Sequence, residues 1–468
     1  MTSAQSAIEH AHANHETYMA GYLELLRIPS ISTDPAYKAE LERCADWVRA
    51  EMERIGFKNC RKMPTAGHPL LYGEWLEAGA DQPTVLIYAH YDVQPVDPLN
   101  LWMTPPFEPT FRDGKLYARG AVDDKAGVFA NLKALESIFA VDGKLPVNVK
   151  LFFEGEEESG SPNMHPFVAA NKDLLQADLL ILCDGGFEPE LPTIAYAGRG
   201  IVGAEVTVTG PDHDLHSGIY GGVVHNPLHV VGRIVGSFHD AEGRVQLPGY
   251  YDTVRKLSDD ELANLEKVWR LTSEMYLAQS GAKHLWAEAM ASVPVRGTAL
   301  PTLEVNGMWG GYQGPGTKTV IPSKAGFKVT MRLVSDQDPS AIVELFTKYV
   351  QSFASDTAAI EVKILAQGAP FRGLFDGAGV EAVQLALVAT TGKRALMERT
   401  GGSIPIAGMF QQELGIPMTN LGLGPGDNIH SPNEYVRVED FYTAIDTAIH
   451  AYYNLTGIKS VSTHSLPG

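Results

Sequence analysis

Short apolar runs that lead into acidic residues or histidine are the feature of this sequence that most restricts its fold. Residues 85–89 lead to His90, residues 149–153 lead to a run of glutamates, and residues 179–183 lead to Asp184. Strands that are apolar on nearly every residue are buried on both faces, which is typical of a largely parallel sheet covered by helices. The carboxyl ends of such strands meet at one edge of the sheet, so we expect these polar side chains to converge there.

The hydrophobic pattern changes after about Gly198, and a chain of 468 residues is longer than one hydrophobic core usually supports. Residues 204–209 and 327–333 alternate apolar with polar side chains, as strands with one face toward water do. Between them, Asn226-Pro227 is a good helix start. Helical spacing covers about 5–28, about 39–55 up to Gly56, and 380–388 before Gly392.

We therefore predict an α/β fold with a mostly parallel central sheet flanked by helices. A discontinuous catalytic domain at residues 1–198 and 380–468 is expected to carry the converging polar residues. An α+β domain at residues 199–379 is expected to interrupt it.

Composition excludes several classes of partner. The chain has 37 Lys and Arg residues against 56 Asp and Glu residues, a formal net charge of −19 that repels nucleic acid and anionic membranes. Cys44, Cys60 and Cys183 are too few and too scattered for a disulfide framework or a zinc knuckle. The N-terminal residues lack a signal-peptide pattern, and no apolar run approaches the roughly 18 residues of a membrane span. We expect a cytoplasmic protein.

The residues at the strand ends have the chemistry of a metal site. His90 and Asp92 are two apart, so on a strand they point to the same face, and the aspartate can orient the imidazole of a ligand. A simple pairing within a turn is the alternative. Asp123 and Asp124 precede an apolar helix, where they either cap the helix or supply a carboxylate that bridges two cations. The glutamates of residues 154–158 would repel one another unless solvent or divalent cations separate them.

Together these motifs match a known family. The set resembles the two-metal peptidases and amidohydrolases that include carnosinases, aminoacylases, succinyl-diaminopimelate desuccinylases and glutamate carboxypeptidases, and its detail is similar to the cytosolic dipeptidase branch. The motifs that carry the resemblance are His90-Tyr91-Asp92, Gly120-Ala121-Val122-Asp123-Asp124-Lys125, Glu154-Gly155-Glu156-Glu157-Glu158-Ser159-Gly160-Ser161, Asp212-His213-Asp214-Leu215-His216-Ser217-Gly218 and Gly401-Gly402-Ser403-Ile404-Pro405.

The resemblance implies a role for each site residue. It implies that His90 and Asp184 bind one metal, that Glu158 and His430 bind the other, and that Asp123 bridges the two. It further implies that Asp92 supports His90, that Glu157 is the general base, and that the Asp123-Asp124 peptide is cis. Because Glu156 stands where relatives often have an apolar residue, an alignment of the glutamates shifted by one stays open.

For residues 199–379 the resemblance implies a lid and dimerisation domain. His216 would cross a homodimer interface and stabilise the oxyanion in the partner's site. Arg332, Thr330 and the backbone of Gly402 and Ser403 would bind the substrate's C-terminal carboxylate. The alternatives are an exposed loop histidine and a solvated or paired arginine.

We predict a dipeptidase that hydrolyses the peptide bond of dipeptides or very short peptides. A water between two divalent metals would be the nucleophile and Glu157 the base. Zn²⁺ suits the imidazole and carboxylate ligands best, and Mn²⁺ or Co²⁺ is also compatible. An N-acyl amino acid amidohydrolase with the same metals is the alternative in chemistry, and an inert metal-binding scaffold is the alternative of another class.

Overall fold

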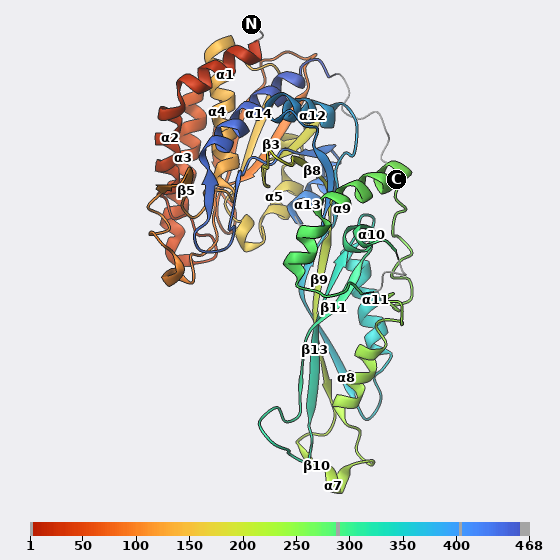
Figure 1. Ribbon diagram of the computed structural model, residues 1–468. Coiled ribbons are helices and arrows are strands. Elements are labelled where there is room, and N and C mark those ends of the chain that lie inside the picture. Colours follow the sequence, from red (N-terminus) through yellow and green to blue (C-terminus); the bar gives the residue numbers. More distant parts are fainter. Residues whose placement is uncertain (1–2, 287–290, 402–404, 459–468) are drawn as a thin grey trace. The chain divides into compact units, whose positions relative to one another are not determined.

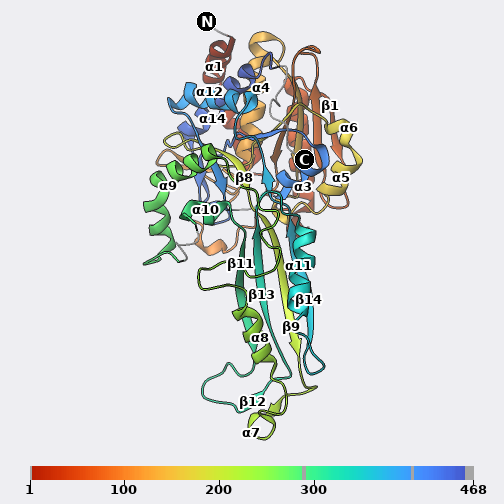
Figure 2. The same ribbon diagram turned by 90° about the vertical axis from the view of Figure 1, so that its right-hand side faces the viewer.

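The computed structural model describes residues 3–286, 291–401 and 405–458 (Figures 1 and 2). Within these ranges the chain divides into two compact units. The first contains the residues up to 196, residues 373–398 and the residues from 409 onward, and the second contains residues 197–372 and 399–408. Among the described residues, no helix combines the length and the apolar character needed to cross a membrane.

The first unit is built on a mixed six-stranded sheet with the order β1-β2-β6-β3-β7-β17. Strands β6, β3, β7 and β17 are parallel to one another, and β2 and β1 continue the sheet in antiparallel fashion. The strands are β1 (Lys58–Met63), β2 (Leu70–Trp75), β3 (Thr84–His90), β6 (Asn148–Glu154), β7 (Leu179–Leu182) and β17 (Met418–Asn420). Every residue of β6 and β7 is buried, which confirms the expectation of strands covered on both faces.

Helices cover this sheet; α14 packs against α1, α4 and α12, and α1 also packs against α4 (Figure 1). The helices of this part of the chain are α1 (Ser3–Ala13), α2 (His15–Leu26), α3 (Lys38–Ile55), α4 (Lys125–Asp142), α5 (Met164–Ala170), α6 (Lys172–Leu175), α12 (Ala378–Thr391), α13 (Pro405–Leu414) and α14 (Val438–Asn454), with short 3-10 turns at η1 (Pro35–Tyr37), η2 (Leu99–Leu101) and η3 (Glu157–Ser159). The predicted stops at Gly56 and Gly392 are left-handed caps with φ of 112° and 73°.

The helix expected over about 5–28 is interrupted. Asn14 separates α1 from α2, and its side-chain amide donates to the backbone oxygen of His10, 2.8 Å away. That oxygen is the acceptor that a continuous helix would offer to the backbone N–H of Asn14, which bonds instead to the oxygen of Ala11. The asparagine side chain therefore competes with the helical hydrogen bond.

A small antiparallel sheet with the order β18-β19-β5-β4 joins two distant segments of the first unit. Its strands are β4 (Thr110–Arg112), β5 (Lys115–Tyr117), β18 (Gly426–Asp427) and β19 (Tyr435–Arg437). Tyr435 pairs with Tyr117, which holds the chain after His430 against the chain before Asp123.

The second unit contains a long antiparallel sheet with the order β11-β13-β9-β14, and α8 and α11 pack on one of its faces (Figure 2). Its elements are β9 (Gly200–Thr209), β10 (Leu215–His216), β11 (Thr302–Gly310), β12 (Val320–Ile321), β13 (Lys324–Leu333), β14 (Ala359–Gly368), α7 (Ser217–Tyr220), α8 (Pro227–Gly236), α9 (Asp259–Ser280), α10 (Val293–Thr298) and α11 (Pro339–Gln351). Val206 and Phe327 of the sheet and Phe346 of α11 belong to the core of this unit. The predicted helix start is present, because the Asn226 side chain accepts from the N–H of Leu228 at 2.9 Å.

The remaining strands are β8 (Thr193–Gly198), β15 (Phe371–Arg372) and β16 (Leu396–Thr400). The sequence placed all residues from 380 onward in the catalytic domain, whereas in the structure residues 399–408 group with the second unit. Side-chain interactions explain the grouping. The guanidinium of Arg399 lies 3.7 Å from the carboxylate of Glu261, and Arg199 Nε donates to the backbone oxygen of Gly401 at 3.1 Å.

Candidate metal centre

The carboxylate of Asp123 lies between two imidazoles in the first unit. Its Oδ1 is 3.0 Å from Nε2 of His90, and its Oδ2 is 2.9 Å from Nε2 of His430. The same nitrogen of His430 lies 3.2 Å from Oε2 of Glu158. Residues from four distant segments thus meet at the carboxyl end of the parallel strands, where we expected them.

The ligand atoms form two adjoining groups, each with its atoms within 4.8 Å of one another. One group is Asp123, Glu158 and His430, and the other is His90, Asp124 and Asp184. The structure therefore brings together all five side chains predicted as ligands. The sequence prediction did not include Asp124 among them, because an acidic residue before an apolar helix is usually a cap. The peptide between Asp123 and Asp124 is cis, as the resemblance implied.

The donor set fits divalent cations. Oε1 of Glu158 and Oδ1 of Asp124 are buried and have no hydrogen-bond partner. The side chain of Glu158 is 2% exposed, and Asp124 is 1% exposed. Buried carboxylate oxygens are strongly destabilising unless a charge or a donor compensates them, and imidazole with carboxylate oxygens is a common ligand set for Zn²⁺ and Mn²⁺.

Asp92 connects His90 to the glutamate run. Its Oδ1 lies 3.3 Å from Nδ1 of His90, and its two carboxylate oxygens accept the backbone N–H groups of Glu157 at 3.2 Å and of Glu158 at 3.1 Å. Asp92 is fully buried. A carboxylate in this place orients the imidazole and also holds the turn that carries the two glutamates.

The three glutamates of this turn point to different partners. The buried Glu156 carboxylate accepts from the backbone N–H of His68 at 2.8 Å and from the side-chain amide of Asn163 at 2.9 and 3.0 Å. Glu158 contacts His430, and Glu157 is half-buried at the start of η3. The Glu156 carboxylate therefore points away from the ligand atoms. Its hydrogen bonds with His68 and Asn163 explain why a polar residue is accommodated at this buried position.

Burial and hydrogen bonding shift several pKa values in this cluster. Burial raises the pKa of Glu157 well above its usual range and raises that of Asp184 to about 6. Hydrogen bonds to Asp123 and Glu158 raise the pKa of His430 to about 10. Burial alone would raise the pKa of Asp123, but the hydrogen bonds from His430 and His90 outweigh burial and lower it. The carboxylates of Asp123 and Glu158 thus share the imidazole of His430 as a partner. A bound divalent cation would supply the further positive charge that these buried carboxylates need.

His430 lies in a loop with unusual backbone conformations. Its φ is 57°, and Asn428 and Asn433 both have φ of 63°. Left-handed conformations are uncommon for residues with a Cβ and recur at functional sites. In this loop Asn433 Oδ1 accepts from the N–H of Met103 at 2.8 Å, and its side-chain amide donates to the oxygen of Leu101 at 2.9 Å. Side-chain hydrogen bonds therefore hold the loop that presents His430.

The remaining predicted residues lie in the second unit. His216 is exposed at the end of β10, and its Nδ1 accepts from the N–H of Gly218 at 3.0 Å. Thr330 and Arg332 are half-buried on β13, opposite Glu304 and Thr302 of β11. The predicted residues Gly402 and Ser403 lie outside the described residues.

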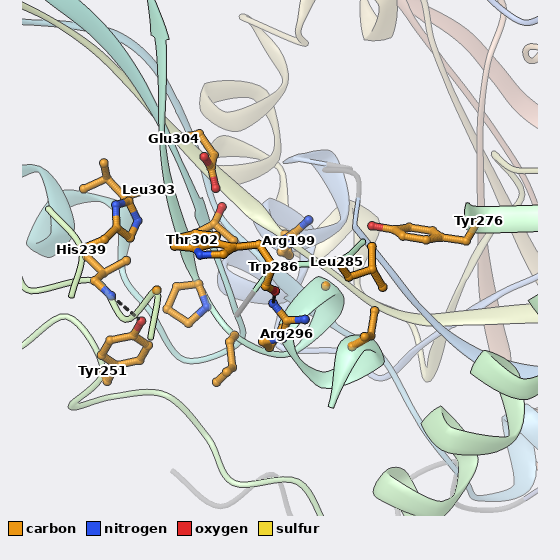
Figure 3. A pocket seen from close by; sticks show the side chains of 16 residues that line it. Arg199, His239, Tyr251, Tyr276, Leu285, Trp286, Arg296, Thr302, Leu303 and Glu304 are labelled. Atoms are coloured by element: carbon orange, nitrogen blue, oxygen red, sulfur yellow. Dashed lines mark hydrogen bonds between the residues drawn. The ribbon is translucent and has the colours of Figure 1, made fainter. Parts of the chain in front are cut away.

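A pocket of about 350 Å³ borders this part of the second unit (Figure 3). Thr302 and Glu304 belong to its wall, together with the aromatic side chains of Tyr276 and Trp286. Arg199 also lines it and is the side chain that bonds to Gly401. Sequence reasoning missed Arg199, because a single arginine between two glycines carries no periodic or motif signal.

Fold and site together define a hydrolase of the metal-dependent peptidase class. Residues 86–454 match the model of peptidase family M20/M25/M40. The chain belongs to this family, which confirms the family and the enzyme class predicted from the sequence.

Relatives and solved structures agree with this assignment. The human Beta-Ala-His dipeptidase is 33% identical over 424 residues, covering 87% of this chain and 83% of that protein. The Cys-Gly metallodipeptidase of Candida albicans is 29% identical over 448 residues, covering 90% and 91%. The crystal structure of an M20 family metallo-carboxypeptidase from Sulfolobus solfataricus superposes with a TM-score of 0.79 at 31% identity, covering 94% of this chain and 99% of that one.

Proposed function

We propose that this enzyme hydrolyses dipeptides and very short peptides that have a free C-terminal carboxylate. The observation that carries the proposal is the Asp123 carboxylate, with one oxygen facing His90 and the other facing His430. A carboxylate that faces two ligand groups is suited to bridge two cations. His90 and Asp184 would hold one cation, and Glu158 and His430 the other, with Zn²⁺ preferred and Mn²⁺ or Co²⁺ compatible.

Bound divalent cations would supply an acidified water and a polarised scissile carbonyl. Glu157 would take the proton from the attacking water and deliver it to the leaving amine. Its half-buried position and the burial that raises the pKa of its carboxyl support this role, because a higher pKa strengthens the base that accepts the proton. Asp92 would hold His90 and the Glu157 backbone in register through the hydrogen bonds described above.

Recognition of the substrate carboxylate would rest on Arg332 and Thr330, with the backbone of Gly402 and Ser403. A planar guanidinium suits a carboxylate because it donates two parallel hydrogen bonds. The pocket in Figure 3 borders the position of Arg332, because Thr302 in its wall is the cross-strand neighbour of Arg332. Side chains of directly paired antiparallel residues lie on the same face of a sheet. The pocket would therefore receive the side chain of the C-terminal residue.

The active form would be a homodimer in which His216 stabilises the oxyanion in the partner's site. Two features support a partner surface at this end of the second unit. His216 is exposed, and Ile219 and Val223 nearby are 69% and 85% exposed. Large exposed apolar side chains that cluster beside a functional residue are typical of interaction sites.

The three free cysteines are compatible with a cytoplasmic enzyme.

A carboxypeptidase that acts on longer peptides is the second candidate. It is favoured by the 31% identity and TM-score of 0.79 with the metallo-carboxypeptidase from Sulfolobus solfataricus. Both functions need a free carboxylate, so they differ in the number of residues that precede the scissile bond.

A substrate panel distinguishes these activities. Purified enzyme with a measured metal content would be given dipeptides including β-Ala-His and Cys-Gly, tripeptides to pentapeptides, and N-acetyl and N-succinyl amino acids. We expect kcat/KM to be greatest for dipeptides and to fall with each added N-terminal residue. A kcat/KM that rises with peptide length would assign a carboxypeptidase, and a preference for N-acyl amino acids would assign an amidohydrolase.

A further inference from the structure

The Glu434 carboxylate is completely buried and accepts four hydrogen bonds from a single stretch of chain. Its Oε2 accepts from the Arg119 guanidinium at 2.7 Å and from the N–H of Gly120 at 2.8 Å. Its Oε1 accepts from the N–H groups of Val122 at 2.7 Å and Asp123 at 3.1 Å. The last donor is the backbone of the residue that we assign as the bridging ligand.

Arg119 also connects Glu434 to the segment that follows His90 and Asp92. Its side chain is 1% exposed, and Nη2 donates to the backbone oxygen of Pro95 at 3.0 Å. Pro95 follows closely on His90 and Asp92 along the chain. One buried ion pair therefore joins the segment after His90, the segment before Asp123 and the loop that presents His430.

The position of Glu434 follows from the small sheet of the first unit. β19 begins at Tyr435, one residue after Glu434, and Tyr435 pairs with Tyr117 of β5. The N–H of Ala118 donates to the backbone oxygen of Glu434 at 3.1 Å, which continues this pairing. Glu434 is also four residues after His430. A shift of its carboxylate would therefore move both the loop that presents His430 and the backbone that carries Asp123.

We propose that Glu434 is a positioning residue for the metal centre. It sets the distance between the Asp123 carboxylate and the His430 imidazole by holding the backbone of both loops. This inference rests on the metal centre of the proposed function. Glu434 itself lies outside both groups of ligand atoms.

A side chain with two accepting oxygens fits this position, because all four partners are donors. Both oxygens of a carboxylate accept hydrogen bonds, whereas one end of a glutamine amide only donates. In Glu434→Gln that amide would face either Arg119 and Gly120 or Val122 and Asp123, so two donors would lose their acceptor. The Arg119 guanidinium would in addition lose its ion-pair partner.

The test measures metal affinity instead of activity alone. Metal-free wild type, Glu434→Gln and the milder Arg119→Lys would be titrated with Zn²⁺ against a chromophoric chelator, and their Co²⁺ complexes compared by visible absorption. We expect an affinity lower by about 10–100-fold in Glu434→Gln, with an altered Co²⁺ spectrum. Arg119→Lys keeps the charge but loses the forked contact, so a smaller loss in the same direction is expected.

Glu261→Gln is the matched control, because Glu261 is also a buried carboxylate with guanidinium partners but lies in the second unit. We expect it to lower the unfolding temperature without changing metal affinity or the Co²⁺ spectrum. If Glu434→Gln folds and binds Zn²⁺ as tightly as wild type, Glu434 has no positioning role. If Glu434→Gln does not fold, unchanged affinity and spectrum in Arg119→Lys would overturn the proposal. A wild type that binds no metal would instead refute the proposed function.

Discussion

Asp123 Oδ2 and His430 Nε2 are 2.9 Å apart although 307 residues separate them in the chain. The contact closes the ligand cluster, because the other oxygen of Asp123 faces His90. It joins a loop from the middle of the first unit to a loop near its C-terminal helix.

Removal of divalent metal is expected to abolish hydrolysis, and addition of Zn²⁺ or Mn²⁺ is expected to restore it. The physical reason is that one buried carboxylate oxygen in each of Glu158 and Asp124, Oε1 and Oδ1, has no hydrogen-bond partner and needs a cation to compensate it. The measurement is dipeptide hydrolysis before and after exhaustive chelation, with metal content determined for each sample. Full activity in verified metal-free protein would refute the metal assignment.

Glu157→Gln is expected to keep near-normal metal content and to lose turnover by about 10²–10⁴-fold, the typical effect of removing a general acid–base. Glu158→Gln should instead lose metal, because this side chain lies 3.2 Å from His430 within the ligand cluster. Metal analysis beside kcat measures both effects. Exchanged phenotypes would show that the alignment of the glutamates is shifted by one.

Asp92→Asn should lower both metal affinity and activity by about 10–100-fold, as loss of a residue that orients a ligand does. In this variant the amide nitrogen would face either the N–H of Glu157 and Nδ1 of His90, which now lie at Oδ1, or the N–H of Glu158, which now lies at Oδ2. Glu156→Gln is the control, because that carboxylate contacts His68 and Asn163 instead. Equal losses of metal affinity in both variants would contradict a specific role for Asp92.

Amidation of the C-terminus of a good dipeptide is expected to lower kcat/KM sharply, and Arg332→Ala should erase the preference for the free acid. Hydrogen bonds to charged groups contribute about 1.5–3 kcal/mol, so the expected loss is roughly 10–150-fold. Lys328→Ala is the control, because Lys328 lies on the same strand and pairs with Glu205 at 3.7 Å. Equal cleavage of free and amidated dipeptides by the wild type would exclude the carboxylate clamp.

Mixed dimers test whether His216 acts in the partner's site. His216→Ala and Glu157→Ala homodimers should each be nearly inactive, because every site lacks one group. In a mixed dimer one site has both groups and the other has neither. Random mixing makes half of the dimers mixed, so about a quarter of wild-type activity should return.

This measurement requires co-expression or subunit exchange, with a different tag on each variant to isolate the mixed species. Wild type carrying the same two tags provides the reference activity. Purified mixed dimers without recovered activity would show that His216 serves its own subunit or has no catalytic role.

The sequence predicted most of the fold and the ligand cluster because both depend on local pattern. Burial on both faces leaves mostly apolar residues in β3, β6 and β7, with Lys150 of β6 as an interior exception, and a polar residue at the end of such a strand stands out. Motif resemblance then assigned roles to these residues. Asn14 escaped this reasoning, because its competing side-chain bond to His10 is a local choice that helical periodicity does not reveal.

Only the tertiary structure decided the contacts between distant segments. It placed Asp124 beside His90 and Asp184, and it directed Glu156 to His68 instead of toward the ligand atoms. It also revealed Glu434, whose role depends on a strand pairing between segments more than 300 residues apart. A residue's type and its local spacing determine which chemistry it can perform. Its partners are determined by chain topology, because a hydrogen bond depends on position in space and not on separation along the sequence.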